Sequence, residues 1–85
     1  MNIIFSTSGW EDYLYFLEKD KRILKRINDL IRDIKRNPKE LGIGKSEKLS
    51  HQLSGFSSRR INQEHRMVYR IKEDSIEIVQ LRNHY

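Results

Sequence analysis

The chain has 85 residues, no cysteine and a formal net charge of +5. This length leaves room for one domain over residues 1–85 with a modest core, and the lack of cysteine excludes disulfides and thiolate metal sites. The positive charge favours a polyanionic partner, which the charge alone does not identify as nucleic acid, acidic protein or anionic membrane.

The first residues predict a strand followed by a helix. The short apolar run at residues 2–5 is typical of a buried strand. Ser8 and Glu11 have the spacing of a capping box, so a helix should follow. Its inner face would consist of Trp10, Tyr13, Leu14 and Leu17.

This start has neither the basic region of a signal peptide nor the apolar length of a membrane anchor, so we expect a soluble, cytoplasmic protein without a membrane partner.

The clearest periodic signal predicts a second helix. Asp20 is placed to cap its start, and Asn37-Pro38 to end it, because a residue before proline avoids helical geometry. Apolar residues recur at helical spacing between these points. They are Ile23, Leu24, Ile27, Leu30, Ile31 and Ile34.

The second half of the chain predicts strands joined by short turns. We expect a loop over residues 39–47 and strands over residues 49–53, 56–62, 65–72 and 75–82. Turns this short join neighbouring antiparallel strands. The order of a strand, two helices and a meander therefore predicts an α+β fold, with the helices packed on one face of a mostly antiparallel twisted sheet.

The strand over residues 65–72 alternates between two kinds of side chain. One side carries His65, Met67, Tyr69 and Ile71, and the other carries Arg66, Val68, Arg70 and Lys72. The first set suits a core under the helices, and the second predicts an open basic face. Arg59 and Arg60 on the preceding strand point to opposite sides, so one of them should join that face. Such a face is suited to a phosphate backbone.

The motifs of metal-dependent and nucleotide-dependent enzymes are missing, so we expect neither a metal nor a cofactor. What remains is a loop glutamate, several arginines and a histidine near the end of the sequence. RNA carries its own nucleophile, the 2′-hydroxyl, and its cleavage needs a base, a cation and an acid, which these residue types can supply. From composition alone, solvated or ion-paired surface charges and a frayed terminal residue are the more ordinary interpretations.

A family resemblance changes this balance. Residues 9–31, residues 53–71 and the ending LRNHY closely resemble the RelE-like toxins, specifically their YoeB branch. The combination of W-x-D-Y-L, LSGF-x-SRRI, EHR-x-VY and a final HY is specific and extends over essentially the whole chain. The resemblance implies the RelE-like fold and the toxin of a type II toxin–antitoxin system. Such toxins are ribosome-dependent mRNA endonucleases that cut in the A site by 2′-hydroxyl attack and so inhibit translation.

The resemblance also implies partners and residue roles. The partners are a cognate YefM-like antitoxin, the bacterial ribosome with its mRNA, operator DNA bound through the antitoxin complex, and a second copy in a homodimer. Glu47 matches the family's general base, His84 its general acid and Arg66 the arginine that stabilises the transition-state phosphate. Tyr85 matches a tyrosine that holds the RNA, and Arg60 a further basic contact. We expect the ribosome to complete the site, since an ordinary glutamate and histidine are weak catalysts for this reaction.

The chain departs from the family pattern at two positions. Ser50 stands where relatives often carry a lysine that contacts phosphate, and Lys48 is expected to replace that contact. Ser57 stands where they carry an aromatic residue. These changes bear on RNA contacts and leave the implied catalytic groups in place.

Two other functions are compatible with the sequence. A ParE-like toxin would use a similar fold to bind a protein target such as gyrase without catalysis, although Glu47 and His84 argue against it. A nucleic-acid-binding module without toxicity would account for the net charge alone.

Overall fold

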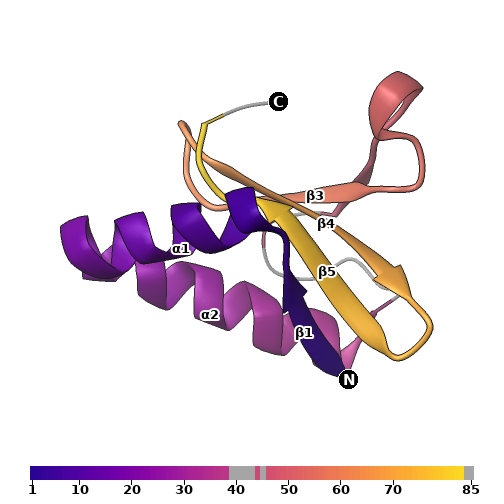
Figure 1. The fold of residues 1–85 in the computed structure, drawn as a ribbon, viewed down its shortest axis with the longest axis horizontal. Coiled ribbons are helices and arrows are strands. Elements are labelled where there is room, and N and C mark those ends of the chain that lie inside the picture. Colours follow the sequence, from indigo (N-terminus) through magenta and orange to yellow (C-terminus); the bar gives the residue numbers. More distant parts are fainter. Residues whose placement is uncertain (39–43, 45, 84–85) are drawn as a thin grey trace.

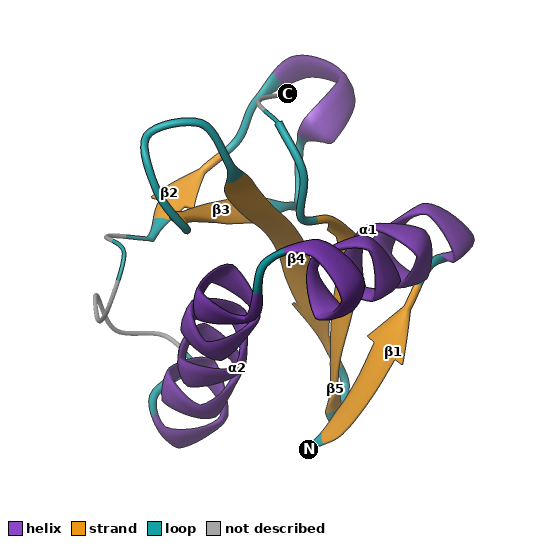
Figure 2. Cartoon of the chain, turned by 90° about the vertical axis from the view of Figure 1, so that its left-hand side faces the viewer, coloured by secondary structure: helices purple, strands orange, loops and turns teal. Residues whose placement is uncertain are grey.

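The computed structural model describes residues 1–38, 44 and 46–83, in which two helices pack on one face of a five-stranded sheet (Figures 1 and 2). The elements are β1 (Asn2–Phe5), α1 (Thr7–Lys19), α2 (Lys21–Arg36), β2 (Glu47–Lys48), β3 (Ser57–Arg60), β4 (Arg66–Lys72) and β5 (Ser75–Gln80). The strand order is β1-β5-β4-β3-β2, and only β1 and β5 are paired in parallel. The predicted α+β architecture is confirmed.

Helix α1 begins earlier than the sequence pattern predicted. Its N-cap is Ser6, whose hydroxyl accepts a hydrogen bond from the amide of Gly9 at 3.0 Å. Gly9 and Phe16 are the buried residues of this helix. A Cβ atom at Gly9 would lie 2.5 Å from the carbonyl oxygen of Ile78, so the glycine is what lets α1 approach β5 this closely. The capping box predicted at Ser8 is therefore wrong.

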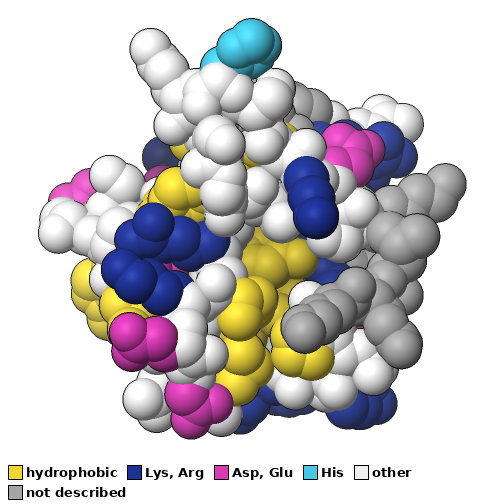
Figure 3. Space-filling view, turned by 90° about the vertical axis from the view of Figure 1, so that its right-hand side faces the viewer, with side chains coloured by type: hydrophobic (Ala, Val, Ile, Leu, Met, Phe, Trp, Pro, Cys, Tyr) yellow, Lys and Arg dark blue, Asp and Glu magenta, His cyan; other side chains and the backbone are white. Residues whose placement is uncertain are grey.

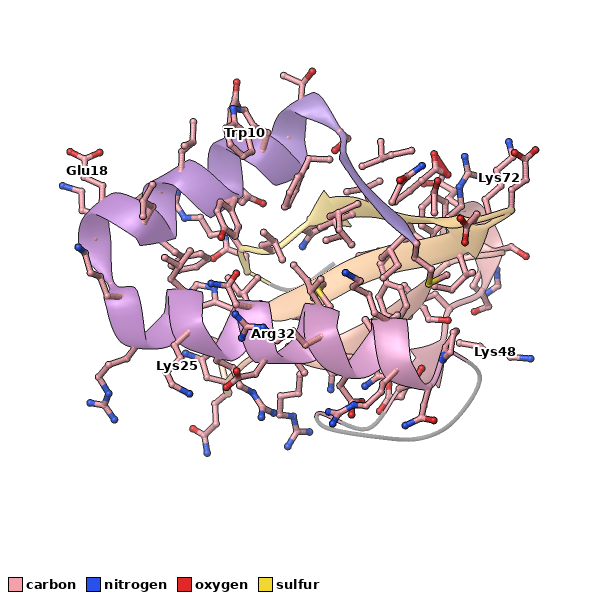
Figure 4. The ribbon with its side chains drawn as sticks, turned by 90° about the horizontal axis from the view of Figure 1, so that it is seen from below. Trp10, Glu18, Lys25, Arg32, Lys48 and Lys72 are labelled. Atoms are coloured by element: carbon pink, nitrogen blue, oxygen red, sulfur yellow. The ribbon has the colours of Figure 1, made fainter. Side chains whose placement is uncertain are left out.

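The residues predicted for the inner face of α1 lie mostly at the surface. Trp10, Leu14 and Leu17 are 47%, 40% and 43% exposed, and Trp10 points outward in Figure 4. Trp10 stacks instead on Tyr13, with the ring centroids 5.9 Å apart. The prediction was wrong because periodicity gives the spacing of an apolar stripe, whereas the close contact between helix and strand sets which face turns inward.

Helix α2 agrees with the sequence pattern. The Asp20 carboxylate accepts hydrogen bonds from the amides of Arg22 and Ile23 at 3.1 and 3.2 Å, and the helix ends directly before Asn37-Pro38. The fully buried apolar residues of this helix are Ile27, Leu30 and Ile34. Burying an aliphatic side chain contributes about 1.5–3 kcal/mol, so this stripe holds α2 against the sheet. Among the described residues, no helix has the length and apolar character needed to cross a bilayer.

The edge strands differ from the prediction. β1 is an edge strand rather than a buried one, since Ile4 is 45% exposed. The strand predicted over residues 49–53 is absent: β2 consists of Glu47–Lys48, and His51–Leu53 form a 3-10 turn. His51 has a φ of 59°, a left-handed conformation that interrupts extended backbone. Glu47 thus lies in a strand rather than a loop, and most of the predicted loop over residues 39–47 falls outside the described residues.

The two faces of the central strand β4 agree only in part with the prediction. The predicted core side is confirmed for His65, Met67 and Tyr69. On the opposite side, Val68 is fully buried, and Arg70 forms an ion pair with Glu77. The hydrogen bond that Arg70 donates within this pair lowers the pKa of Glu77. Figure 3, which views the side opposite to Figure 2, shows Lys and Arg side chains in separate groups divided by hydrophobic and acidic ones. The predicted open basic face is therefore interrupted.

Candidate active site

Three adjacent strands bring Glu47, Ser58 and Arg66 together. Glu47 pairs with Ser58 across β2 and β3, and Arg60 pairs with Arg66 across β3 and β4. Paired residues of an antiparallel ladder point to the same side, so these side chains share the face away from the helices. The Nη1 atom of Arg66 lies 3.7 Å from Oε2 of Glu47 and donates a hydrogen bond to Oγ of Ser58 at 3.3 Å.

The two charged groups of this pair differ in exposure. The Glu47 side chain is 55% exposed, whereas that of Arg66 is 12% exposed. A ligand can therefore reach the carboxylate from solvent, while the guanidinium is held in one orientation by the sheet. A phosphate bound against Arg66 would lie within reach of the Glu47 carboxylate, which is the arrangement that proton abstraction next to a phosphate requires.

A buried network holds the start of β2 in place. The hydroxyl of Ser46, the residue before Glu47, forms a hydrogen bond with the hydroxyl of Tyr69 at 3.2 Å. Tyr69 in turn accepts a hydrogen bond from Nε of Arg59, which forms an ion pair with Asp33 of α2. We refer to Asp33, Arg59 and Tyr69 as the buried ionic network. Through it, the position of the candidate base depends on packing between α2 and the sheet.

The electrostatics of this network keep Arg59 charged. Desolvation in the core pulls the pKa of Arg59 down, but hydrogen bonds with Tyr69 and Asp33 outweigh it and raise the pKa above its ordinary value. Arg59 is the member of the Arg59–Arg60 pair that turns toward the helices, and Arg60 is the one that joins the open face.

A hollow of about 240 Å³ lies beside the Glu47–Arg66 pair. It is lined by Arg26, Gly44, Glu47, Arg60 and Arg66. Arg26 comes from α2 and donates a hydrogen bond from Nη2 to the carbonyl oxygen of Arg60 at 3.1 Å. Among the described residues, the lining has three guanidinium groups and one carboxylate, a positive balance that suits a phosphate-bearing ligand.

Sequence reasoning missed Arg26, which looks like one of many charges on the polar side of a helix. A signal was present, however. Arg26 follows Ile23 by three residues and precedes Leu30 by four, so it shares the apolar face of α2. A cation on the edge of such a stripe is directed toward the sheet rather than into bulk solvent.

The structure does not bring every predicted residue to this hollow. Glu47, Arg60 and Arg66 line it together. Lys48 pairs with Ser57 and alternates with Glu47 along β2, so it points to the other face of the sheet, and Figure 4 shows it extending away from the molecule. His84 and Tyr85 lie outside the described residues.

The residue before His84 is nevertheless close to the site. The carbonyl oxygen of Asn83 accepts a hydrogen bond from the backbone amide of Arg66 at 3.2 Å. A bulge in β5 opposite Val68 and Tyr69 shifts the alternation of that strand before the chain reaches this point. Within residues 1–38, 44 and 46–83, no three His, Cys, Asp or Glu side chains gather as metal ligands would.

Two helices packed on a five-stranded sheet place the chain in a class of small α+β proteins that includes solved bacterial toxins. A family model described as a YoeB-like toxin of bacterial type II toxin–antitoxin systems matches residues 5–85. The chain belongs to this family. Toxin YoeB of Escherichia coli strain K12 is 55% identical over 85 residues, which cover all of both chains.

Solved structures are also similar over the full chain, and two of them come from Staphylococcus aureus. A YoeB–YefM complex from Staphylococcus aureus has a TM-score of 0.93 and 47% identity, covering 100% of this chain and 98% of its own. A YoeB dimer from the same organism has a TM-score of 0.93 and 48% identity, with the same coverage of both chains. The likeness therefore includes the sheet and both helices that position the site.

Proposed function

We propose that this toxin is a ribosome-dependent endoribonuclease that cuts mRNA in the ribosomal A site by metal-free acid–base catalysis. The observation that carries the proposal is the Arg66 guanidinium held 3.7 Å from the solvent-accessible Glu47 carboxylate. Membership in the YoeB-like family supports it. Ribosomal RNA and protein would complete the site around the bound message.

In the proposed reaction, Glu47 removes the proton of a ribose 2′-hydroxyl. The 2′-oxygen then attacks the neighbouring phosphorus, so that an O2′–P bond forms as the P–O5′ bond breaks. Arg66 stabilises the charge that develops on the phosphorane oxygens. His84 donates a proton to the leaving 5′-oxygen, and the products are a 2′,3′-cyclic phosphate and a 5′-hydroxyl.

The remaining residues would hold the RNA. Arg60 and Arg26, on the rim of the hollow, are placed for phosphates that flank the scissile one. We assign base or backbone contact to Tyr85, following the family pattern. Lys48 would contact RNA or the ribosome outside the hollow, because it points to the other face. The hydrogen bond between Arg66 and Asn83 supports placing His84 near the reacting phosphate.

The test uses bacterial ribosomes stalled on a labelled message with an open A site. We expect the wild-type chain to cut within the A-site codon, and His84→Gln to cut at least about 100-fold more slowly, since general acid catalysis contributes about 10²–10⁴-fold. Lys25→Ala is the matched control, because this lysine lies on the outer side of α2, paired with Asp29.

Mapping the 5′ ends of the products separates the possible results. No cutting by the wild-type chain would overturn the nuclease proposal and favour a ParE-like protein target such as gyrase. Equal cutting by wild type and His84→Gln would keep the nuclease and remove His84 as the acid.

We also propose a cognate YefM-like antitoxin, a homodimer, and operator DNA bound through the antitoxin complex. The Staphylococcus aureus relatives, solved as a YoeB–YefM complex and as a dimer, support the first two. We expect the product of the neighbouring gene to co-purify with this chain on co-expression, and the purified complex to cut A-site mRNA at least about tenfold more slowly than the free toxin. A neighbouring product that neither co-purifies nor suppresses cutting would contradict this partner.

A further inference from the structure

His65 is a buried histidine that the proposed reaction does not use. It is 7% exposed and directly precedes Arg66 at the start of β4. The Asn62 side chain accepts hydrogen bonds from the amides of Glu64 and His65 at 2.9 and 2.7 Å, which fixes the turn before the strand. The imidazole packs against the ring of Phe16 in an edge-to-face arrangement, with the centroids 5.0 Å apart. These contacts hold both the backbone of His65 and its imidazole ring in place.

The hydrogen bond that His65 accepts defines its tautomer. The backbone amide of Asn83 donates to Nδ1 of His65 at 2.8 Å. An amide N–H can only donate, so Nδ1 carries the lone pair and the ring proton of the neutral imidazole lies on Nε2. Nε2 is 3.6 Å from a carboxylate oxygen of Glu64.

Asn83 is held at both ends of its backbone by two consecutive residues, His65 before β4 and Arg66 at its start. Its amide donates to His65, and its carbonyl oxygen accepts from the amide of Arg66 at 3.2 Å. Its φ of 66° makes a bend that a strand does not adopt. The Gln80 side chain donates to the carbonyl oxygens of Arg82 and Asn83 at 3.1 and 3.4 Å. This bend is therefore fixed by four hydrogen bonds to backbone groups.

The bend at Asn83 is hydrogen-bonded to the backbone of Arg66, the residue that the proposed function assigns to the phosphorane charge. We propose that neutral His65 is a positioning residue that, through Nδ1, fixes the Asn83 bend against Arg66. The inference rests on the proposed function for its effect on cutting. Two neighbouring residues would then have different roles: His65 would hold Asn83, and Arg66 would bind the reacting phosphate.

Protonation of His65 would undo this contact. A proton on Nδ1 removes the acceptor and sets two N–H groups against each other. His65 lines a second hollow, of about 290 Å³. Among the described residues, the other titratable or charged groups in its lining are Tyr15, Lys19, Asp20, Glu64 and Arg82. The charged groups among these described residues are two of each sign. Protonation of the ring should therefore lower cutting by the wild-type protein.

Nitrogen NMR of the free wild-type protein is the first experiment, because it needs neither a variant nor RNA. We expect the His65 ring at pH 8 to show a non-protonated Nδ1 and a protonated Nε2, with the Asn83 amide signal shifting as the ring titrates. Two results would overturn the inference: a proton on Nδ1 at pH 8, or an Asn83 amide signal that does not shift when the His65 ring is protonated. This result is independent of whether the protein cuts mRNA.

Two variants then test the effect on cutting. His65→Asn keeps an oxygen acceptor near the Nδ1 position and cannot be protonated, so it should cut within about threefold of wild type at pH 8. His65→Leu removes the acceptor and should lower kcat by about 10- to 100-fold with KM nearly unchanged. Thermal unfolding confirms that each variant is folded. Equal activity of the folded Leu variant and wild type, or equal loss in both variants, would overturn the inference, whereas a wild type that does not cut would overturn only the proposed function.

Discussion

Replacing Asp33 by alanine is expected to lower the free energy of unfolding by about 3–5 kcal/mol. The reason is that Arg59 is fully buried and would lose the carboxylate with which it forms an ion pair. Taking a guanidinium out of water costs several kcal/mol, and the carboxylate offsets much of that cost only while both partners are present. The total free energy of unfolding of a native domain is only about 5–15 kcal/mol, so this loss would be a large fraction of it. Urea unfolding followed by circular dichroism measures it.

A double variant and a matched control distinguish the ion pair from general damage to α2. Asp33→Leu combined with Arg59→Met removes both charges and should recover at least about 2 kcal/mol relative to Asp33→Ala, because no buried cation remains. Asp29→Ala removes an acid from the same helix that pairs only at the surface, with Lys25 and Arg32. It should cost less than about 1 kcal/mol. Equal losses in Asp33→Ala and Asp29→Ala would show that the buried ionic network does not carry this stability.

The parts of the fold that the sequence predicted are those with strong local signals. Helix α2 has an apolar stripe, an N-cap at Asp20 and a proline stop, and all three agree in the structure. β4 shows strict alternation, and its core side is as predicted at Met67 and Tyr69. In these segments, burial of one face is enough to decide both the type of element and its orientation.

The parts that were missed depend on contacts between distant residues. The face of α1 that turns inward is set by the close approach of Gly9 to the backbone of Ile78. A glycine has no side chain, so a search for periodic apolar residues does not detect this contact. Asp33 and Arg59 both look like surface charges along the sequence, yet they meet in the core. No local pattern distinguishes a charge with a buried partner from a solvated one.

In the candidate site too, local motifs identified some residues, whereas the contacts between distant residues could not be predicted. Family motifs identified Glu47 and Arg66, but their meeting depends on the register of β2, β3 and β4, which a sequence pattern does not contain. Lys48 was expected on the side of the missing family lysine, and the two-residue strand turns it to the other face. Arg26 entered the hollow from a helix that the motifs do not mark as functional.

Replacing Arg66 or Arg26 by alanine is expected to change different kinetic constants of mRNA cutting. Arg66→Ala should lower kcat by about 10²–10³-fold with little change in KM, because its guanidinium would stabilise charge that appears only in the transition state. Arg26→Ala should raise KM while leaving kcat within about threefold. Its guanidinium is tied to the carbonyl oxygen of Arg60 on the rim of the hollow, so it would hold a flanking phosphate equally in the ground state and the transition state.

Single-turnover cutting of A-site mRNA over a range of toxin concentrations separates the two effects, with thermal unfolding run on each variant. Lys25→Ala removes the same unit of charge from the outer side of α2, so a loss of affinity caused only by net charge would appear in it as well. A fall in kcat for Arg26→Ala as large as that for Arg66→Ala would place Arg26 at the reacting phosphate instead. A KM effect in Arg66→Ala without a kcat effect would mean that Arg66 binds RNA and that the transition-state charge is stabilised elsewhere, which would leave Glu47 without its cation in the proposed reaction.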